Sequence, residues 1–148
     1  MSAERNPSER STLLHGDLTG RIVGAFFEVH RALGFGFLES VYSHALLHEL
    51  RRRGLVADRE VGCSVTYREV VVGQFSADII VNGLVVLELK TARMFDPTNV
   101  AQLLNYLRST ELELGLLLNF GQRAQFERVV FTNNRKRTAS ADHELAPP

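Results

Sequence analysis

Apolar residues recur along the chain at two spacings, and each spacing predicts one type of element. Between about Asp17 and Leu33 they follow steps of three and four, which is the spacing of one face of an amphipathic helix. A second helix is predicted from about Phe37 to Arg53, with Gly54 as its stop. Its expected inward residues are Leu38, Val41, Ala45, Leu46 and Leu50.

From about Arg59 the pattern changes to alternating apolar and polar residues, which predicts strands. Three strands, at about 59–67, 70–81 and 84–90, would form an antiparallel meander. A turn at Arg68-Glu69 would join the first two, and a turn around Asn82-Gly83 the second and third.

The rest of the folded chain is predicted to be a helix and two more strands. Asp96-Pro97 predicts the helix start, with aspartate as N-cap and proline at the first helical position. Leu114 to Phe120 is a nearly continuous apolar run, typical of a strand covered on both faces, and Phe126 to Phe131 is the expected last strand. The predicted fold is therefore α/β (α+β), a mixed sheet flanked by helices in the order α-α-β-β-β-α-β-β, with a right-handed crossover before Leu114.

Size and composition favour a single domain. The chain has 148 residues and 45% hydrophobic content. Residues 1–13 and 133–148 lack periodicity, so we expect disordered tails around one domain at 14–132. No apolar run is long enough to span a membrane and the N-terminus is no signal peptide, which predicts a cytoplasmic protein without a membrane partner.

Charged residues interrupt the apolar hairpin around Asn82-Gly83. A two-residue loop would send Asp78 and Glu88 to opposite faces. A three-residue loop, Val81-Asn82-Gly83, would pair Ile80 with Leu84 and place Asp78, Glu88 and Lys90 on one face. The opposite face would then hold only apolar side chains, namely Ala77, Ile79, Val85, Leu87 and Leu89. We predict this second register.

Converging carboxylates are hard oxygen ligands that suit Mg²⁺ or Mn²⁺. A lysine beside them could orient a water or neutralise a phosphate, so the group suits metal-assisted phosphodiester hydrolysis. Lys90 is also the only lysine outside the predicted tail, in a chain with fifteen arginines. The alternative is a plain ion pair between Lys90 and Glu88 or Asp78 on a solvent-facing strand.

Two helical pairs add polar groups to this picture. Glu39 and Tyr42 are three residues apart and share a helix face, although a glutamate in a first turn is ordinarily explained by the helix dipole. Gln102 and Tyr106 are four apart on the third helix, where Gln102 could be an ordinary exposed residue.

Four blocks in order carry a resemblance to a known family. Asp78 followed by Glu88-x-Lys90 and by Gln102 and Tyr106 resembles the PD-(D/E)XK nuclease superfamily, which has a restriction-endonuclease-like fold. With Gly36-Phe-Leu-Glu39-Ser-Val-Tyr42 before them, the blocks resemble the small GxxExxY family within it. The resemblance spans about Leu18 to Thr132.

The resemblance implies a role for each matching residue. It implies that Asp78 and Glu88 are metal ligands, with the Leu89 carbonyl as a third and Glu39 completing the site, and that Lys90 is the catalytic lysine. Tyr42, Gln102 and Tyr106 would border the site or hold substrate. The implied cofactor is Mg²⁺, with Mn²⁺ as a substitute.

Two functions of different classes follow. The first is a Mg²⁺-dependent nuclease that hydrolyses phosphodiester bonds of nucleic acid, DNA ahead of RNA. The second is a non-catalytic binding or assembly module that keeps the nuclease fold within a larger complex. This second function is suggested by the absence of net charge, since the chain has 17 basic and 17 acidic residues. A homodimer would suit either function, because a lone small domain has little surface for gripping a duplex.

Overall fold

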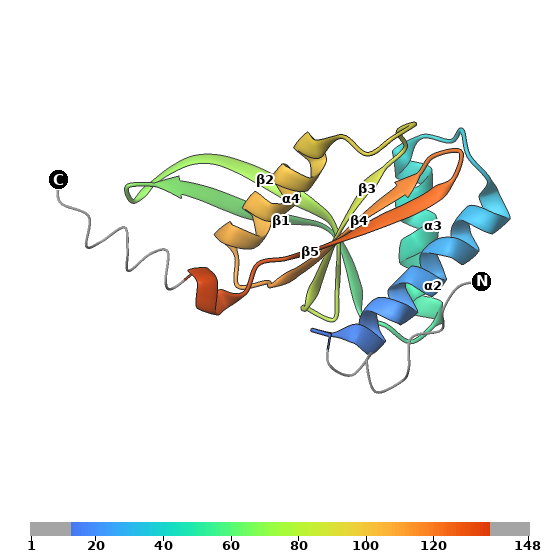
Figure 1. Ribbon diagram of the computed structural model, residues 1–148, viewed down its shortest axis with the longest axis horizontal. Helices are drawn as coiled ribbons and strands as arrows, with labels where there is room; N and C mark the ends of the chain where they lie inside the picture. The colour runs from blue at the N-terminus through green and yellow to red at the C-terminus, as the bar shows by residue number, and fades with distance from the viewer. Residues whose placement is uncertain (1–12, 137–148) are drawn as a thin grey trace.

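A computed structural model describes residues 13–136, which form five strands and three long helices in the predicted order (Figure 1). The helices and strands are α2 (Gly16–Leu33), α3 (Glu39–Arg52), β1 (Ala57–Tyr67), β2 (Val70–Val81), β3 (Val85–Lys90), α4 (Pro97–Ser109), β4 (Leu114–Phe120) and β5 (Ala124–Val130). The restriction-endonuclease-like α/β prediction is confirmed.

The strands lie side by side in chain order, β1-β2-β3-β4-β5. All neighbours are antiparallel except β3 and β4, which are parallel. A parallel pair needs a crossover, and α4 supplies it. The Asp96 carboxylate caps this helix by accepting a hydrogen bond from Thr98 N at 2.9 Å, as the Asp-Pro signal predicts.

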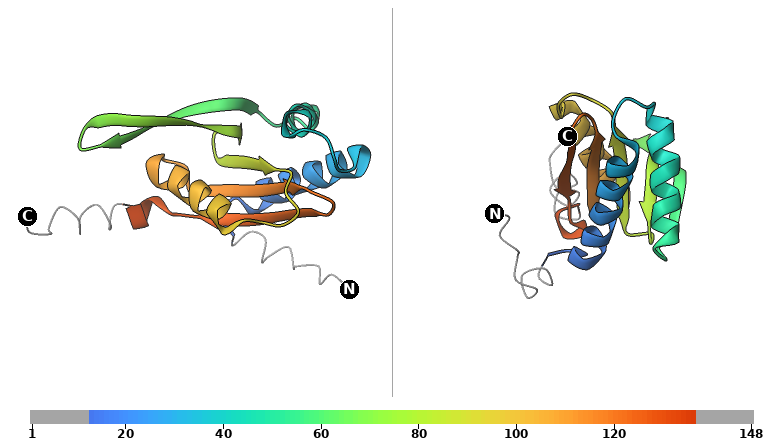
Figure 2. Two further views of the ribbon diagram at one scale, coloured as in Figure 1. Left: turned by 90° about the horizontal axis from the view of Figure 1, so that it is seen from above. Right: turned by 90° about the vertical axis from the view of Figure 1, so that its right-hand side faces the viewer.

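The core has two layers, one on each side of the sheet. Helices α2 and α3 lie side by side (Figure 2) and pack on one face, whereas α4 packs on the other. All seven residues of β4 are buried, which confirms a central strand covered on both faces. Leu116 and Leu118 pack toward α2 and α3, while Leu117 packs toward α4.

The expected inward face of α3 is wrong at its N-terminal end. Leu38 is 77% exposed and Val41 is 38% exposed. Leu38 is the N-cap and has an extended backbone, so it lies before the helix and cannot start its apolar stripe. The buried stripe instead begins at Tyr42 and continues through Leu46 and Leu50.

The register of the β2–β3 hairpin differs from the predicted one. Val81 pairs with Val85 and Ile80 with Val86, so the three-residue loop is Asn82-Gly83-Leu84 rather than Val81-Asn82-Gly83. Asn82 fixes the loop to the segment before β1, because its N–H and its Oδ1 both bond the backbone of Val56, at 2.7 and 2.9 Å. The predicted pairing is displaced by two residues on β3, which leaves the alternation of faces unchanged.

Ala77 does not join the apolar face on which Ile79 and Leu87 lie. It packs in the α4 layer, near Tyr106 and Leu107. The β1–β2 ladder has no pair between Arg59–Ile79 and Val61–Ala77, and Glu60 has a positive φ of 55° at that point. Beyond this interruption, Ala77 and Phe75 of the hairpin pack in the α4 layer.

The outer part of the β1–β2 hairpin projects beyond the rest of the sheet (Figure 2). Its tip is the predicted Arg68-Glu69 turn, in which both residues have positive φ. Val70, Val71 and Val72 follow one another along β2 and are all exposed.

The C-terminal part of the fold extends beyond the predicted limit at 132. Residues 133–136 form a helical turn. The Lys136 ammonium donates to the carbonyl oxygens of Thr110 and Leu112 at 2.8 and 2.7 Å, which anchors the turn at the end of α4. The tails predicted at 1–12 and 137–148 lie outside the described residues. In the described part, no helix is long and apolar enough to cross a membrane.

Candidate active site at the end of β3

Asp78 lies at the point where β2 and β3 separate. The antiparallel ladder ends at the pair Ile79–Leu87. Asp78 is the residue before Ile79 on β2, and its Oδ2 atom accepts a hydrogen bond from the Leu89 N–H at 2.6 Å. The side chain thus replaces the missing ladder partner and holds the carboxylate between Glu88 and Lys90.

Glu88 is a half-buried acid beside another acid. The pKa of Glu88 is raised to about 8, first by burial and then by the Asp78 charge, while the Lys90 charge opposes both effects. Two carboxylates without a cation between them favour retention of a proton, because both charges in one poorly solvated place repel each other. A divalent cation at the pair would remove that cost.

Glu39 joins the group from the first turn of α3. Burial raises the pKa of Glu39, and the charges of Lys90 and Asp78 act on it in opposite directions. Glu39, Asp78 and Leu89 line one cavity of about 190 Å³. The structure therefore brings together five of the residues that the sequence singled out, from α3, β2 and β3: Glu39, Asp78, Glu88, Leu89 and Lys90.

The α4 pair borders the same place from the other side. Gln102 and Tyr106 line a cavity of about 350 Å³ together with Glu88. Tyr106 is 2% exposed and packs edge-to-face against Phe75, with ring centroids 4.8 Å apart. Burial raises the pKa of the Tyr106 hydroxyl, with smaller contributions from the charges of Cys63 and Glu88.

Tyr42 lies in the core rather than at a surface where substrate could touch it. It is fully buried and stacks on Phe120 with centroids 4.5 Å apart. Its hydroxyl donates to the Gly34 carbonyl at 2.6 Å and accepts from Phe37 N at 3.4 Å. These contacts hold the loop that leads into Glu39, and the predicted role of Tyr42 in bordering the site or binding substrate stays a prediction.

Two comparisons with known proteins bear on the family and the fold. The family model described as the PD-(D/E)XK nuclease superfamily matches residues 16–129. The chain belongs to the PD-(D/E)XK nuclease superfamily. The solved structure titled "Crystal structure of SSO0001" is similar with a TM-score of 0.52 and 18% identity, over 90% of this chain and 69% of that one, which supports the fold alone. The comparison with curated proteins gives no match.

The donor set of this PD-(D/E)XK chain fits a cation bound by few protein ligands. Among residues 13–136 there is no group of three or more His, Cys, Asp or Glu side chains placed to hold a metal ion. Mg²⁺ usually keeps several waters and takes only one or two carboxylates, together with substrate phosphates. The Asp78–Glu88 pair satisfies that smaller requirement.

Two residues of the PD-(D/E)XK domain that support the site were missed in the sequence. Arg59 lines the cavity with Glu39, and its Nε donates to Ser43 Oγ at 3.0 Å. Asn119 is 1% exposed and bonds both the N–H and the carbonyl of Ala92, two residues after Lys90. An asparagine within the apolar run 114–120 was the available signal, because a buried amide requires partners.

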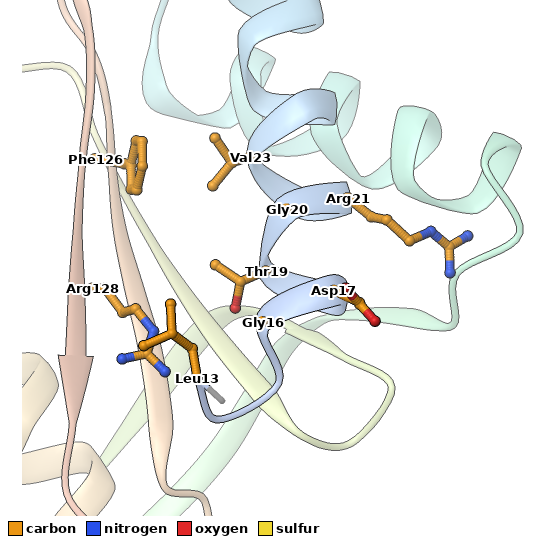
Figure 3. A pocket seen from close by; sticks show the side chains of 9 residues that line it. All are labelled: Leu13, Gly16, Asp17, Thr19, Gly20, Arg21, Val23, Phe126 and Arg128. Carbon is orange, nitrogen blue, oxygen red and sulfur yellow. The ribbon is translucent and has the colours of Figure 1, made fainter. Parts of the chain in front are cut away.

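A wider cavity of about 610 Å³ lies elsewhere, between the start of α2 and β5 (Figure 3). Two atoms of its lining, the Thr19 hydroxyl oxygen and the Arg128 Nε, have no hydrogen-bond partner among residues 13–136. None of the predicted site residues lines it. Size alone therefore does not identify the functional site of this nuclease-superfamily domain.

Proposed function

We propose that the protein is a Mg²⁺-dependent nuclease that hydrolyses phosphodiester bonds, with DNA as the preferred substrate over RNA. The observation that carries the proposal is the poorly solvated pair Asp78–Glu88 beside Lys90 at the end of β3. A structural ion pair would need one acid, whereas this place holds two, and the charges of Lys90 and Asp78 also act on Glu39. We also assign the chain to the GxxExxY group within the superfamily, on its Gly36, Glu39 and Tyr42.

The proposed ligands of the cation are the carboxylates of Asp78 and Glu88 and the Leu89 carbonyl, with Glu39 at the side of α3. When bound, Mg²⁺ or Mn²⁺ would supply Lewis-acid charge stabilisation and a more acidic water. The hydrogen bond from Leu89 N–H keeps Asp78 oriented toward β3 without a ligand.

Lys90 is proposed as the catalytic lysine. Its ammonium lies close enough to Glu88 and Glu39 to interact with their charges, a position from which it could neutralise a phosphate or orient a water. Gln102 and Tyr106 are proposed to hold the substrate from α4, where they share a cavity with Glu88.

Cleavage assays test the proposal. Plasmid, single-stranded DNA and RNA would be incubated with the wild type in Mg²⁺, Mn²⁺ or EDTA, beside Asp78→Asn and Lys90→Met. We expect metal-dependent cleavage that falls by at least about a hundredfold in both variants. A Glu127→Gln variant, altered at an exposed acid of β5, should cleave like the wild type. Cleavage that is unchanged in Asp78→Asn and Lys90→Met would refute the assignment.

A second candidate is a non-catalytic module that binds or assembles through the same fold. It is favoured by the missing cluster of three metal-binding side chains in the described part of the chain. Calorimetric titration with Mn²⁺ separates the two candidates. A site that binds Mn²⁺ in the wild type and loses it in Glu88→Gln supports the nuclease, whereas no Mn²⁺ binding supports the module.

A further inference from the structure

A second cavity opens directly beyond the proposed catalytic lysine. It measures about 340 Å³, and its lining includes Thr91 and Arg93, which follow Lys90, and Phe35 and Phe37 of the α2–α3 loop. None of the residues assigned to the metal or to substrate binding lines it. Its role is therefore separate from that of the carboxylate pair.

One wall presents aromatic rings to solvent. Phe35 is 61% exposed and Phe37 is 49% exposed. The loop is held in this shape, because Gly34 and Gly36 have φ of 70° and 108°, which other residues rarely adopt. Tyr42 bonds the backbone on both sides of Phe35, and the Phe37 ring packs edge-to-face on Tyr42 at 6.1 Å.

The opposite wall is fixed to the core as well. Asn119 holds Ala92 through hydrogen bonds of 3.0 and 2.9 Å. Gly121 packs so closely under Ala92 that a Cβ there would collide with the Ala92 carbonyl. His30 Nε2 lies 2.8 Å from the Gly121 carbonyl oxygen, which ties the β4–β5 turn to α2. The cavity is therefore preorganised on both sides.

Arg93 gives the cavity a positive charge. Its side chain is exposed, and no ion pair engages it within residues 13–136. A ligand that suits these walls has a flat apolar face and carries negative charge nearby. Nucleotides have both properties, since bases stack on aromatic rings whatever their sequence and each linkage carries a phosphate.

We propose that this cavity receives an unpaired nucleobase of the strand to be cut, which makes single-stranded or locally unpaired nucleic acid the substrate class. The proposal rests on the nuclease function. A base inside a duplex is stacked on both faces and cannot offer one to Phe35. The base would stack on Phe35 while Arg93 contacts a neighbouring phosphate. The nucleic-acid strand would then continue past Lys90.

Binding measured without metal tests the proposal. Fluorescence anisotropy in EDTA would give dissociation constants for a labelled 15-nucleotide single strand, for the same strand with abasic positions, and for a blunt duplex. The variants are Phe35→Ala, Phe35→Tyr, which keeps the ring, and Phe126→Ala, which removes a phenyl that is 41% exposed on β5.

We expect the wild type to prefer the single strand over the duplex. Phe35→Ala should weaken single-strand binding by about fivefold to a hundredfold, the usual range for loss of one stacked base. Phe35→Tyr should restore it and Phe126→Ala should leave it unchanged. Phe35→Ala should have no effect on the abasic strand, because that strand has no base to stack.

Three results would overturn the proposal: equal affinity for strand and duplex, no effect of Phe35→Ala, or an equal loss with the abasic strand. A wild-type dimer in sedimentation that Phe35→Ala dissociates would assign the rings to a second copy instead. Cleavage distinguishes the two proposals. If Phe35→Ala still cleaves in a metal-dependent way, at the rate of the wild type, the base-binding proposal alone is refuted. If single-strand binding depends on Phe35 but no cleavage occurs, the nuclease proposal alone is refuted.

Discussion

The carboxylate of Asp78 accepts a hydrogen bond from the backbone N–H of Leu89, which stands between Glu88 and Lys90 on β3. Asp78 is therefore part of the sheet's hydrogen-bonding as well as of its chemistry. Substitutions can separate its role as hydrogen-bond acceptor from its proposed role as metal ligand. The amide oxygen of an asparagine can accept the hydrogen bond but is not an anionic ligand.

Asp78→Asn should keep the stability of the wild type and lose metal binding, whereas Asp78→Ala should lose metal binding and also be less stable. The alanine leaves the Leu89 N–H without its acceptor, which costs about 1–3 kcal/mol. Thermal denaturation in EDTA should place the melting temperature of Asp78→Ala several degrees below that of Asp78→Asn. Equal melting temperatures for the two variants would mean that the Leu89 bond contributes nothing to stability.

The metal-free protein should lose stability as the pH rises from about 4.5 to 8. The pKa of Glu88 is raised from 4.5 to about 8 in the folded state, so the folded form keeps a proton that the unfolded chain releases in this range. The stabilisation is complete below the lower value and is lost as the pH passes through the upper one. Glu88→Gln should flatten this dependence, by on the order of 2–4 kcal/mol between the two limits.

Melting temperatures in EDTA at several pH values measure this effect. Glu127→Gln serves as the control, because it removes an exposed acid from β5 and should leave the slope of the wild type. A Glu88→Gln profile parallel to the wild-type profile would contradict the assignment of the proton to Glu88.

Tyr42→Phe should destabilise the protein by about 1–2 kcal/mol, because it removes a buried hydrogen bond to the Gly34 carbonyl. Hydrogen exchange of the Phe37 amide, which also bonds this hydroxyl, should accelerate. Tyr67→Phe is the matched control at a tyrosine that is 62% exposed. If both variants unfold at the same temperature as the wild type, Tyr42 does not fasten the loop.

Gly121→Ala should cost about 1–3 kcal/mol, because the added methyl group would overlap the Ala92 carbonyl and the backbone has to move. Gly73→Ala offers a comparison in β2, where a Cβ would meet no atom within 4 Å. Urea denaturation should separate the two variants clearly. The Gly121 variant should also bind single-stranded DNA less well, since it shifts one wall of the Phe35 cavity.

Local patterns predicted the element order because each depends on neighbouring residues. The Asp-Pro cap, the alternation of β1 and the apolar run of β4 all report local environments. The prediction that Asp78 and Glu88 share a face depended only on the alternation of side chains between the two faces of a strand. A register error of two residues leaves that alternation unchanged.

The wrong or missing predictions concern features that depend on contacts or boundaries outside the local pattern. The Asn82 turn shifted because Val56, 26 residues away, bonds its side chain. Leu38 looked like a core residue, yet the helix starts after it. The hydrogen-bond partners of Tyr42 and Asn119 could not be predicted from the sequence. Each side chain bonds a backbone carbonyl of a loop, and such a bond does not depend on the spacing of residue types.

The strand order β1-β2-β3-β4-β5 has a consequence for how the protein folds. Three of its four strand pairs join through short turns, and only β3 and β4 must wait for a helix to form and dock between them. Asp78 stands on β2, whereas Glu88 and Lys90 both stand on β3 and lie opposite Leu117 and Asn119 in that late pair. The β2–β3 hairpin should thus bring the two acids and the lysine together early, and the docking of β4 should fix them in place, so that the proposed site is complete only when the last strand pair has formed.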